Sequence, residues 1–184
     1  MKTSDASVLI VPGYKGSGPD HWQSRWEAKL SAAHRVEQKD WETPHLRDWI
    51  DTLVTAVNRA EKPVILVPHS LGVAAVIRAV SNFQTGKVVG AYMVGLPDVE
   101  SITHVPAALQ HFGPLPTDPL PFPSRLIASR NDPYCAFARA EHFAHAWGSH
   151  FQDAGEVGHI NEESGHGPWP EGLLSFARFT SHLG

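Results

Sequence analysis

One nine-residue stretch, residues 64–72, most constrains what this chain can fold into. It reads Val-Ile-Leu-Val-Pro-His-Ser-Leu-Gly: a short apolar run ends just before Ser70, and a segment of small and apolar residues with a helical pattern follows at once. A strand that turns sharply into a helix at a serine is the layout of a nucleophile elbow, which exposes the serine hydroxyl. The usual elbow reads Gly-x-Ser-x-Gly. Here Gly72 supplies the second glycine, but Pro68 stands at the position of the first.

Short apolar runs alternate with longer helical segments along the whole chain. The runs are residues 8–11, 64–67, 88–94 and 126–128, with two weaker strand candidates around Val36 and at residues 150–153. Helices are expected at residues 21–33, 46–60, 71–82, 137–147 and 171–182, where apolar residues follow the 3.6-residue period. This alternation predicts an α/β fold with a parallel sheet of about six strands and helices on both faces. We expect a single domain over residues 1–184, with its site at the carboxyl edge of the strands.

The segment of residues 97–123 interrupts the alternation. It carries seven prolines and no clear regular pattern. A connection of that length is unusual in a compact domain and is often functional. Two interpretations stay open: a small cap over a pocket, or a packed surface loop with at most one helical turn around residues 105–110.

The charge, the apolar runs and the cysteine count indicate which binding partners and which cellular location to expect. The formal net charge is −4, so the chain has no basic footprint for nucleic acid. The longest apolar run near the start, residues 8–11, is too short for a membrane span. The single cysteine, Cys135, cannot form an internal disulfide, which favours a cytoplasmic location. We read Cys135 as a buried bystander thiol.

Twelve histidines raise the question of a metal site. The pairs that could bind a metal are His142 with His145 and His159 with His166. The first pair has no acidic third ligand at a convincing spacing for zinc. We therefore expect neither a metal nor a cofactor.

A serine nucleophile needs a histidine base, and that base needs an orienting carboxylate. In hydrolases with a nucleophile elbow, the order along the chain is serine, acid, histidine. Asp132 follows the strand at residues 126–128 and is the favoured acid, with Asp98 as the competitor. His159 follows the last candidate strand, in a segment where two glycines, Gly155 and Gly158, allow a tight loop. It is the favoured base, with His166 as the alternative.

Two backbone N–H groups must face the negative charge that develops on the substrate oxygen. One is expected from Leu71, directly after the nucleophile. The other is expected from the glycine-rich loop after the first strand, and we choose Tyr14. The loop lacks the Gly-Lys-Ser/Thr ending of a P-loop, so phosphate binding is disfavoured. His69 is expected to point away from the nucleophile and to serve packing or hydrogen bonding. The pocket wall is expected to include the proline-rich segment, Tyr14, and Trp22 or Trp169.

With these residues assembled, the chain resembles the small serine-hydrolase family that includes retinoblastoma-binding protein nine and many bacterial homologues. The resemblance covers nearly the whole chain. The motifs that carry it, beside the elbow, are Val-Pro-Gly-Tyr at residues 11–14, Ser-Gly-Pro-Asp-His-Trp at 17–22, Ala-Ser-Arg-Asn-Asp-Pro-Tyr at 128–134, Gly-His-Ile-Asn at 158–161 and Ser-Gly-His-Gly-Pro-Trp-Pro at 164–170. It implies a compact three-layer α/β-hydrolase fold without a large lid domain. It also implies a triad that carries over to Ser70, Asp132 and His159. Pro68 departs from the family, which more often has glycine there.

The predicted function is therefore that of a carboxylesterase-like serine hydrolase that cleaves a small ester, thioester or amide by acyl transfer. An amidase or peptidase would share the nucleophile and base, so the sequence does not separate these activities. The partner expected is a small-molecule acyl substrate, and the chain itself is expected to be a monomer or a small homo-oligomer. The alternative is a catalytically weak or inactive binding or scaffold protein with a hydrolase fold, which Pro68 motivates.

Overall fold

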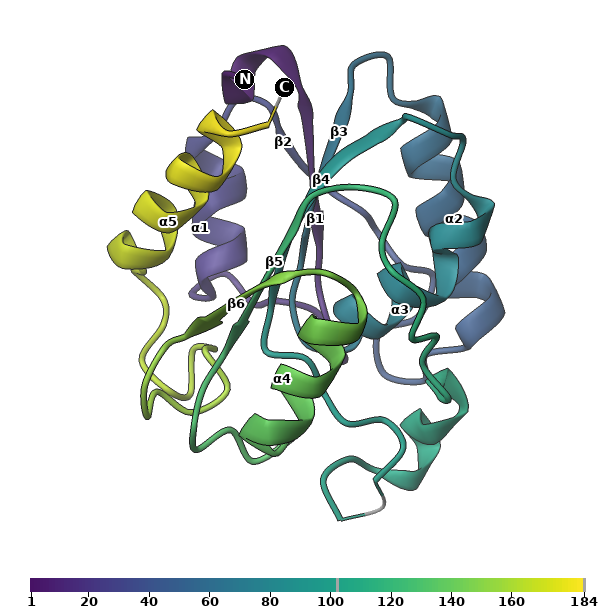
Figure 1. The fold of residues 1–184 in the computed structure, drawn as a ribbon, viewed down its shortest axis with the longest axis vertical. Coiled ribbons are helices and arrows are strands. Elements are labelled where there is room, and N and C mark those ends of the chain that lie inside the picture. Colours follow the sequence, from purple (N-terminus) through teal and green to yellow (C-terminus); the bar gives the residue numbers. More distant parts are fainter. Residues whose placement is uncertain (102, 184) are drawn as a thin grey trace.

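A six-stranded parallel sheet forms the centre of the molecule (Figure 1). The computed structural model describes residues 1–101 and 103–183. The strands lie in the order β2-β1-β3-β4-β5-β6 and every adjacent pair is parallel. Their bounds are β1 Ser7–Val11, β2 Ala33–Arg35, β3 Val64–Pro68, β4 Val88–Val94, β5 Ser124–Ala128 and β6 His150–Asp153. The chain moves outward from β1 to β2 and then returns to the other side of β1, which puts a topological switch point between β1 and β3.

Five α-helices cover the two faces of this sheet (Figure 1). They are α1 Trp22–Lys29, α2 Leu46–Arg59, α3 Leu71–Ala79, α4 Phe137–Ala146 and α5 Pro170–Ser181. Short 3₁₀ helices lie at η1 Thr3–Asp5, η2 Val80–Asn82 and η3 Ala107–Phe112. Helices α1 and α5 pack on one face, and α2, α3 and α4 pack on the other. The predicted three-layer α/β-hydrolase fold is confirmed.

Alternation of side chains along each strand produces two separate apolar layers. In β1, Val8 and Ile10 pack against α1 and α5, whereas Leu9 and Val11 face α2 and α3. Both sets are buried, which explains why the strand reads as a continuous apolar run rather than as an alternating pattern. Trp49, in the first turn of α2, is buried in the second layer.

The predicted helix at residues 21–33 is wrong at its end. Helix α1 stops at Lys29, and Ala33 opens β2, where it pairs with Val8 of β1. The backbone N–H of Leu30 donates to the carbonyl of Trp26, and Leu30 itself is extended. Pairing with the edge of the sheet outweighs the helical propensity of the alanines here.

The proline-rich segment packs against the second layer. Among the residues of this segment that the structure describes, the one regular element is η3, close to the single helical turn expected at residues 105–110. Val105, Leu109, Phe112, Leu115 and Phe122 are all buried, so the segment is a packed part of the core. Within the described ranges, none of the helices has the length and apolar character that a membrane crossing requires.

Candidate active site

Ser70 occupies a strained backbone position between β3 and α3. Its φ of 54° and ψ of −127° place a non-glycine residue in the left-handed half of the backbone map. The N–H of Ser70 donates to the carbonyl of Val94 in β4, and the N–H of His69 donates to the carbonyl of Val11 in β1, both at 3.0 Å. Hydrogen bonds to both neighbouring strands therefore hold the turn in this conformation.

Two glycines make room for the turn. A Cβ on Gly72 would lie 2.3 Å from the carbonyl oxygen of Val11, a backbone atom that cannot rotate away. A Cβ on Gly13 would lie 2.7 Å from Cβ of Ser70 and 3.1 Å from the backbone nitrogen of Leu71. The elbow thus needs glycine at position 72 and in the facing loop at position 13.

Pro68 removes one hydrogen bond from the sheet without displacing the elbow. The N–H groups of Val64 and Ser70 both donate toward β4, to Lys87 and Val94. N–H groups two residues apart point to the same side of a strand, so Pro68 lies where the next donor to β4 would stand. The ladder resumes at Ser70.

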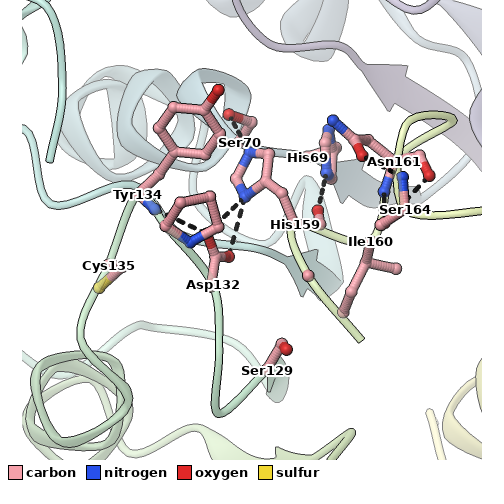
Figure 2. Close-up of polar contacts among 12 residues, drawn as sticks. His69, Ser70, Ser129, Asp132, Tyr134, Cys135, His159, Ile160, Asn161 and Ser164 are labelled. Carbon is pink, nitrogen blue, oxygen red and sulfur yellow. Dashed lines mark hydrogen bonds and ion pairs between the residues drawn. The ribbon is translucent and has the colours of Figure 1, made fainter. Parts of the chain in front are cut away.

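Three side chains from three strand ends form one hydrogen-bonded chain (Figure 2). Ser70 Oγ lies 2.8 Å from His159 Nε2. His159 Nδ1 lies 2.8 Å from Oδ2 of Asp132 and 3.0 Å from its Oδ1. A carboxylate only accepts, so Nδ1 carries the proton and Nε2 is free to accept from the serine hydroxyl. The Asp132 and His159 side chains are only 4% and 7% exposed, which shields this chain from competing water.

The competing acid and base lie elsewhere. Asp98 faces Arg139, with its Oδ2 3.7 Å from Nε of that guanidinium. His166 Nδ1 lies 3.1 Å from Ser164 Oγ in its own loop. Asp132, by contrast, also accepts the backbone N–H of Tyr134, which fixes the orientation of the carboxylate.

Two polar side chains of the loop that carries Asp132 (the acid loop) accept hydrogen bonds from the loop that carries His159 (the base loop). Asn131 Oδ1 accepts the N–H of Gly158 at 2.7 Å, and Ser129 Oγ accepts the N–H of Val157 at 3.0 Å. The loops that carry Asp132 and His159 are thereby tied together by two hydrogen bonds just before the aspartate–histidine contact. Neither anchoring residue was predicted, although both stand within three residues of the candidate acid in the sequence.

A second clamp acts on His159 and the residue after it. Nε2–H of His69 donates to the carbonyl of His159 at 3.0 Å (Figure 2). Nε1–H of Trp22 donates to the carbonyl of Ile160 at 2.9 Å. Ile160 has a φ of 51°, so the chain turns sharply at this point. Gly95 leaves space for the contact between His69 and His159, since a Cβ there would lie 3.2 Å from the carbonyl oxygen of His159. His69 is thus a buried hydrogen-bonding residue, as predicted.

The histidines beside the base are held neutral. Burial lowers the pKa of His69 well below 6.5. Burial, helped by the charge of Arg35, lowers the pKa of His21 from 6.5 to about 3. The rings of His21 and His159 lie 4.8 and 4.9 Å from that of His69, between centroids. Two neutral rings beside His159 impose no charge repulsion on an imidazolium formed there.

A cavity of about 490 Å³ opens over Ser70 and His159. Tyr14 and Leu71, the two predicted backbone donors, both line it. Within the described ranges, neither backbone N–H donates to another backbone group. Both are therefore free for a bound oxygen.

The predicted tryptophan lining is wrong. Trp22 is fully buried and donates its hydrogen bond to the carbonyl of Ile160. Trp169 packs on Trp22 with ring centroids 5.1 Å apart. Gly172 permits this packing, because a Cβ there would lie 2.1 Å from the indole of Trp169.

Cys135 and the histidine pairs supply no second site. Burial raises the pKa of the Cys135 thiol to about 12, so it stays protonated. Among the residues described, no three histidine, cysteine, aspartate or glutamate side chains gather closely enough to hold a metal ion.

The sheet, the switch point and the strand–serine–helix turn define the class of protein: this is an α/β hydrolase. The family model described as Serine hydrolase matches residues 8–178, and the chain belongs to that family. The YdeN-like protein of Pectobacterium atrosepticum has a solved structure with a TM-score of 0.85 and 33% sequence identity, covering 97% of this chain and 92% of that one.

More distant structures share the fold. The ydeN gene product of Bacillus subtilis has a TM-score of 0.78 at 23% identity, over 95% of this chain and 98% of that one. The esterase RhEst1 of a Rhodococcus species has a TM-score of 0.68 at 16% identity, over 100% of this chain and 93% of that one. In sequence, YdeN of Bacillus subtilis strain 168 is 31% identical over 91 residues, and the match spans about half of each protein, 47% of this chain and 48% of YdeN.

Proposed function

We propose that this protein hydrolyses a small carboxylic ester or thioester by acyl transfer through Ser70, His159 and Asp132. The observation that carries the proposal is the continuous chain of hydrogen bonds from Asp132 through His159 to Ser70 Oγ, at 2.8 Å in each link. It supplies a nucleophile, a base within reach of the proton, and a carboxylate that holds the base in the required tautomer.

In the first half of the reaction, Ser70 Oγ attacks the substrate carbonyl as its proton passes to His159 Nε2. The carbonyl oxygen becomes an oxyanion, which accepts from the backbone N–H groups of Tyr14 and Leu71. When the tetrahedral intermediate collapses, the bond to the leaving group breaks. His159 delivers its proton to the departing oxygen or sulfur, and the acyl group stays on Ser70.

In the second half, water attacks the acyl-enzyme. His159 Nε2 takes a proton from the water, the ester bond to Ser70 breaks, and the proton returns to Oγ. The carboxylic acid leaves, and the enzyme regains its starting state. Asp132 stays ionised throughout and stabilises the imidazolium.

Several finer assignments belong to this proposal. Amide substrates share the same nucleophile and base, so a panel of matched esters and amides separates the activities. Kinship with retinoblastoma-binding protein nine rests on the motif residues, and a cytoplasmic location rests on the cysteine count. The rival role, a binding protein without turnover, predicts an unreactive Ser70.

A fluorophosphonate probe tests the proposal, because it reacts only with an activated serine. The wild type should be labelled at Ser70, Ser70→Ala should not be labelled, and Ser4→Ala, which removes an exposed serine far from the cavity, should be labelled at the wild-type rate. Equal labelling of the wild type and Ser70→Ala, or an unlabelled wild type that hydrolyses no short ester, would refute it.

A further inference from the structure

The cavity over Ser70 has two chemically different walls. One wall is apolar and comes from the proline-rich segment and the start of α3; it consists of Leu71, Pro97, Val105, Pro106 and Leu109. The other is polar and comes from the loop after β1 and the loop after His159; it includes Lys15, Asn161, Glu162 and Glu163. A substrate bound across Ser70 therefore meets a different chemistry on each side.

The proton path decides which part of the substrate meets which wall. The leaving group must lie within reach of His159 Nε2, because this atom delivers its proton. Asn161 follows His159 by two residues, and both line the cavity together with Glu162 and Glu163. The leaving group is thus directed to the polar wall, and the acyl group is left facing the apolar wall.

The apolar wall is fixed in place before any substrate binds. Leu109 packs into the main core and is only 5% exposed, and Val105 is buried to the same extent. The segment around them is tied to neighbouring helices: Arg78 of α3 donates to the carbonyl of Pro114 at 2.8 Å, and Arg139 of α4 contacts Glu100 at 2.9 Å. A fixed apolar wall gains affinity from each methylene it covers, with no ordering cost at binding.

We propose that the acyl group of the substrate is an apolar chain of short to medium length, bound by Val105 and Leu109, and that the leaving group is polar. The assignment rests on the proposed function, since it takes Ser70 and His159 as the reacting groups. The volume of about 490 Å³ admits a small molecule of this kind.

The first test measures kcat/KM for p-nitrophenyl acetate, butyrate and hexanoate, so that only the acyl chain varies. Covering one methylene changes affinity by about fourfold, so kcat/KM should rise by roughly that factor per methylene. Leu109→Ala should reduce the hexanoate-to-acetate ratio several-fold. Leu115→Ala is the matched control, since Leu115 is also 5% exposed in the same segment but does not line the cavity described here. It should keep the wild-type ratio.

The second test separates this inference from the proposed function. Binding of acetate, butyrate and hexanoate to Ser70→Ala is measured by titration calorimetry, which requires no turnover. Affinity should rise with chain length, and the rise should disappear in Ser70→Ala/Leu109→Ala but not in Ser70→Ala/Leu115→Ala. Length-dependent binding with an unreactive wild-type serine would refute the hydrolase and leave the acyl site standing.

The opposite combination overturns the acyl site alone. If the wild type is labelled by the probe and hydrolyses the esters, yet neither rate nor affinity depends on chain length, the apolar wall does not hold the acyl group. An equal loss of length dependence in Leu109→Ala and Leu115→Ala would also overturn it, because the effect would then come from general loosening of the segment.

Discussion

Replacing His69 by leucine tests whether the base loop is held from behind. In the native protein, His69 Nε2–H donates to the carbonyl of His159 at 3.0 Å, and both residues are buried. Leucine fills similar space but donates no hydrogen bond, so the buried carbonyl loses its partner. An unsatisfied buried acceptor costs about 1–3 kcal/mol, and the free energy of unfolding should fall by about that amount.

The same substitution should slow catalysis. The hydrogen bond from Trp22 to the carbonyl of Ile160 would remain, but the carbonyl of His159 would lose its hydrogen bond from His69. Displacement of a reacting group by about 1 Å costs up to roughly 100-fold in rate, so kcat should fall between about 10- and 100-fold. KM should change less than kcat, because the apolar wall around Leu109 is unchanged.

Urea unfolding and steady-state hydrolysis of p-nitrophenyl butyrate measure the two effects. His69→Gln is the matched control, because its amide nitrogen can donate where Nε2–H does, and it should recover most of the rate. A leucine variant with wild-type kcat would refute the reasoning. So would a glutamine variant that is as slow as the leucine variant while remaining folded.

Three further predictions follow from the same geometry. Gly72→Ala places a Cβ 2.3 Å from a backbone oxygen and should lower the free energy of unfolding by more than about 3 kcal/mol. In Gly86→Ala the new Cβ meets no atom within 4 Å and only the positive φ is unfavourable, so the loss should be about 1–2 kcal/mol. Chemical unfolding of both variants measures the difference. Asp132→Asn should lower kcat by roughly 10⁴-fold with little change in KM, because the amide carries no negative charge and can donate to Nδ1, which favours the tautomer with its proton on Nε2. A loss under tenfold in steady-state kinetics would contradict that role. His21 and His69 stay neutral in the folded state, whereas in the unfolded chain they take up protons near pH 6.5. The free energy of unfolding is therefore highest above that pH and falls below it, by on the order of 1 kcal/mol per histidine between pH 7.5 and 5.5. Urea unfolding at both pH values measures the fall, and His21→Asn should remove the contribution of one histidine.

Much of the architecture could be predicted from the pattern of residues. Strands buried on both faces must be apolar throughout, and helices between them must carry one apolar face, so β3, β4 and α2 stood out. The end of α1 could not be found in this way. Alanines around position 33 suit a helix, and only pairing with β1 assigns Ala33 to a strand.

The site divides in the same manner. Ser70, Asp132 and His159 could be favoured because parallel strands bring their carboxyl ends to one edge. Asp132 was preferred to Asp98 because it follows the later strand, but the sequence left Asp98 and His166 open as alternatives. The structure places the selected three within hydrogen-bond distance of one another. Their catalytic roles await the labelling experiment.

Local preferences can be read along the chain: where strands and helices form, where the serine separates a strand from a helix, and which polar residues stand at strand ends. The tertiary structure alone decided which distant groups meet. The contacts from His69 to His159 and from Trp22 to Ile160 join residues 90 and 138 positions apart, and the apolar wall at Leu109 comes from a segment without a repeating pattern. Such contacts depend on the path of the whole chain around the sheet, because no periodicity within a short stretch of sequence records them.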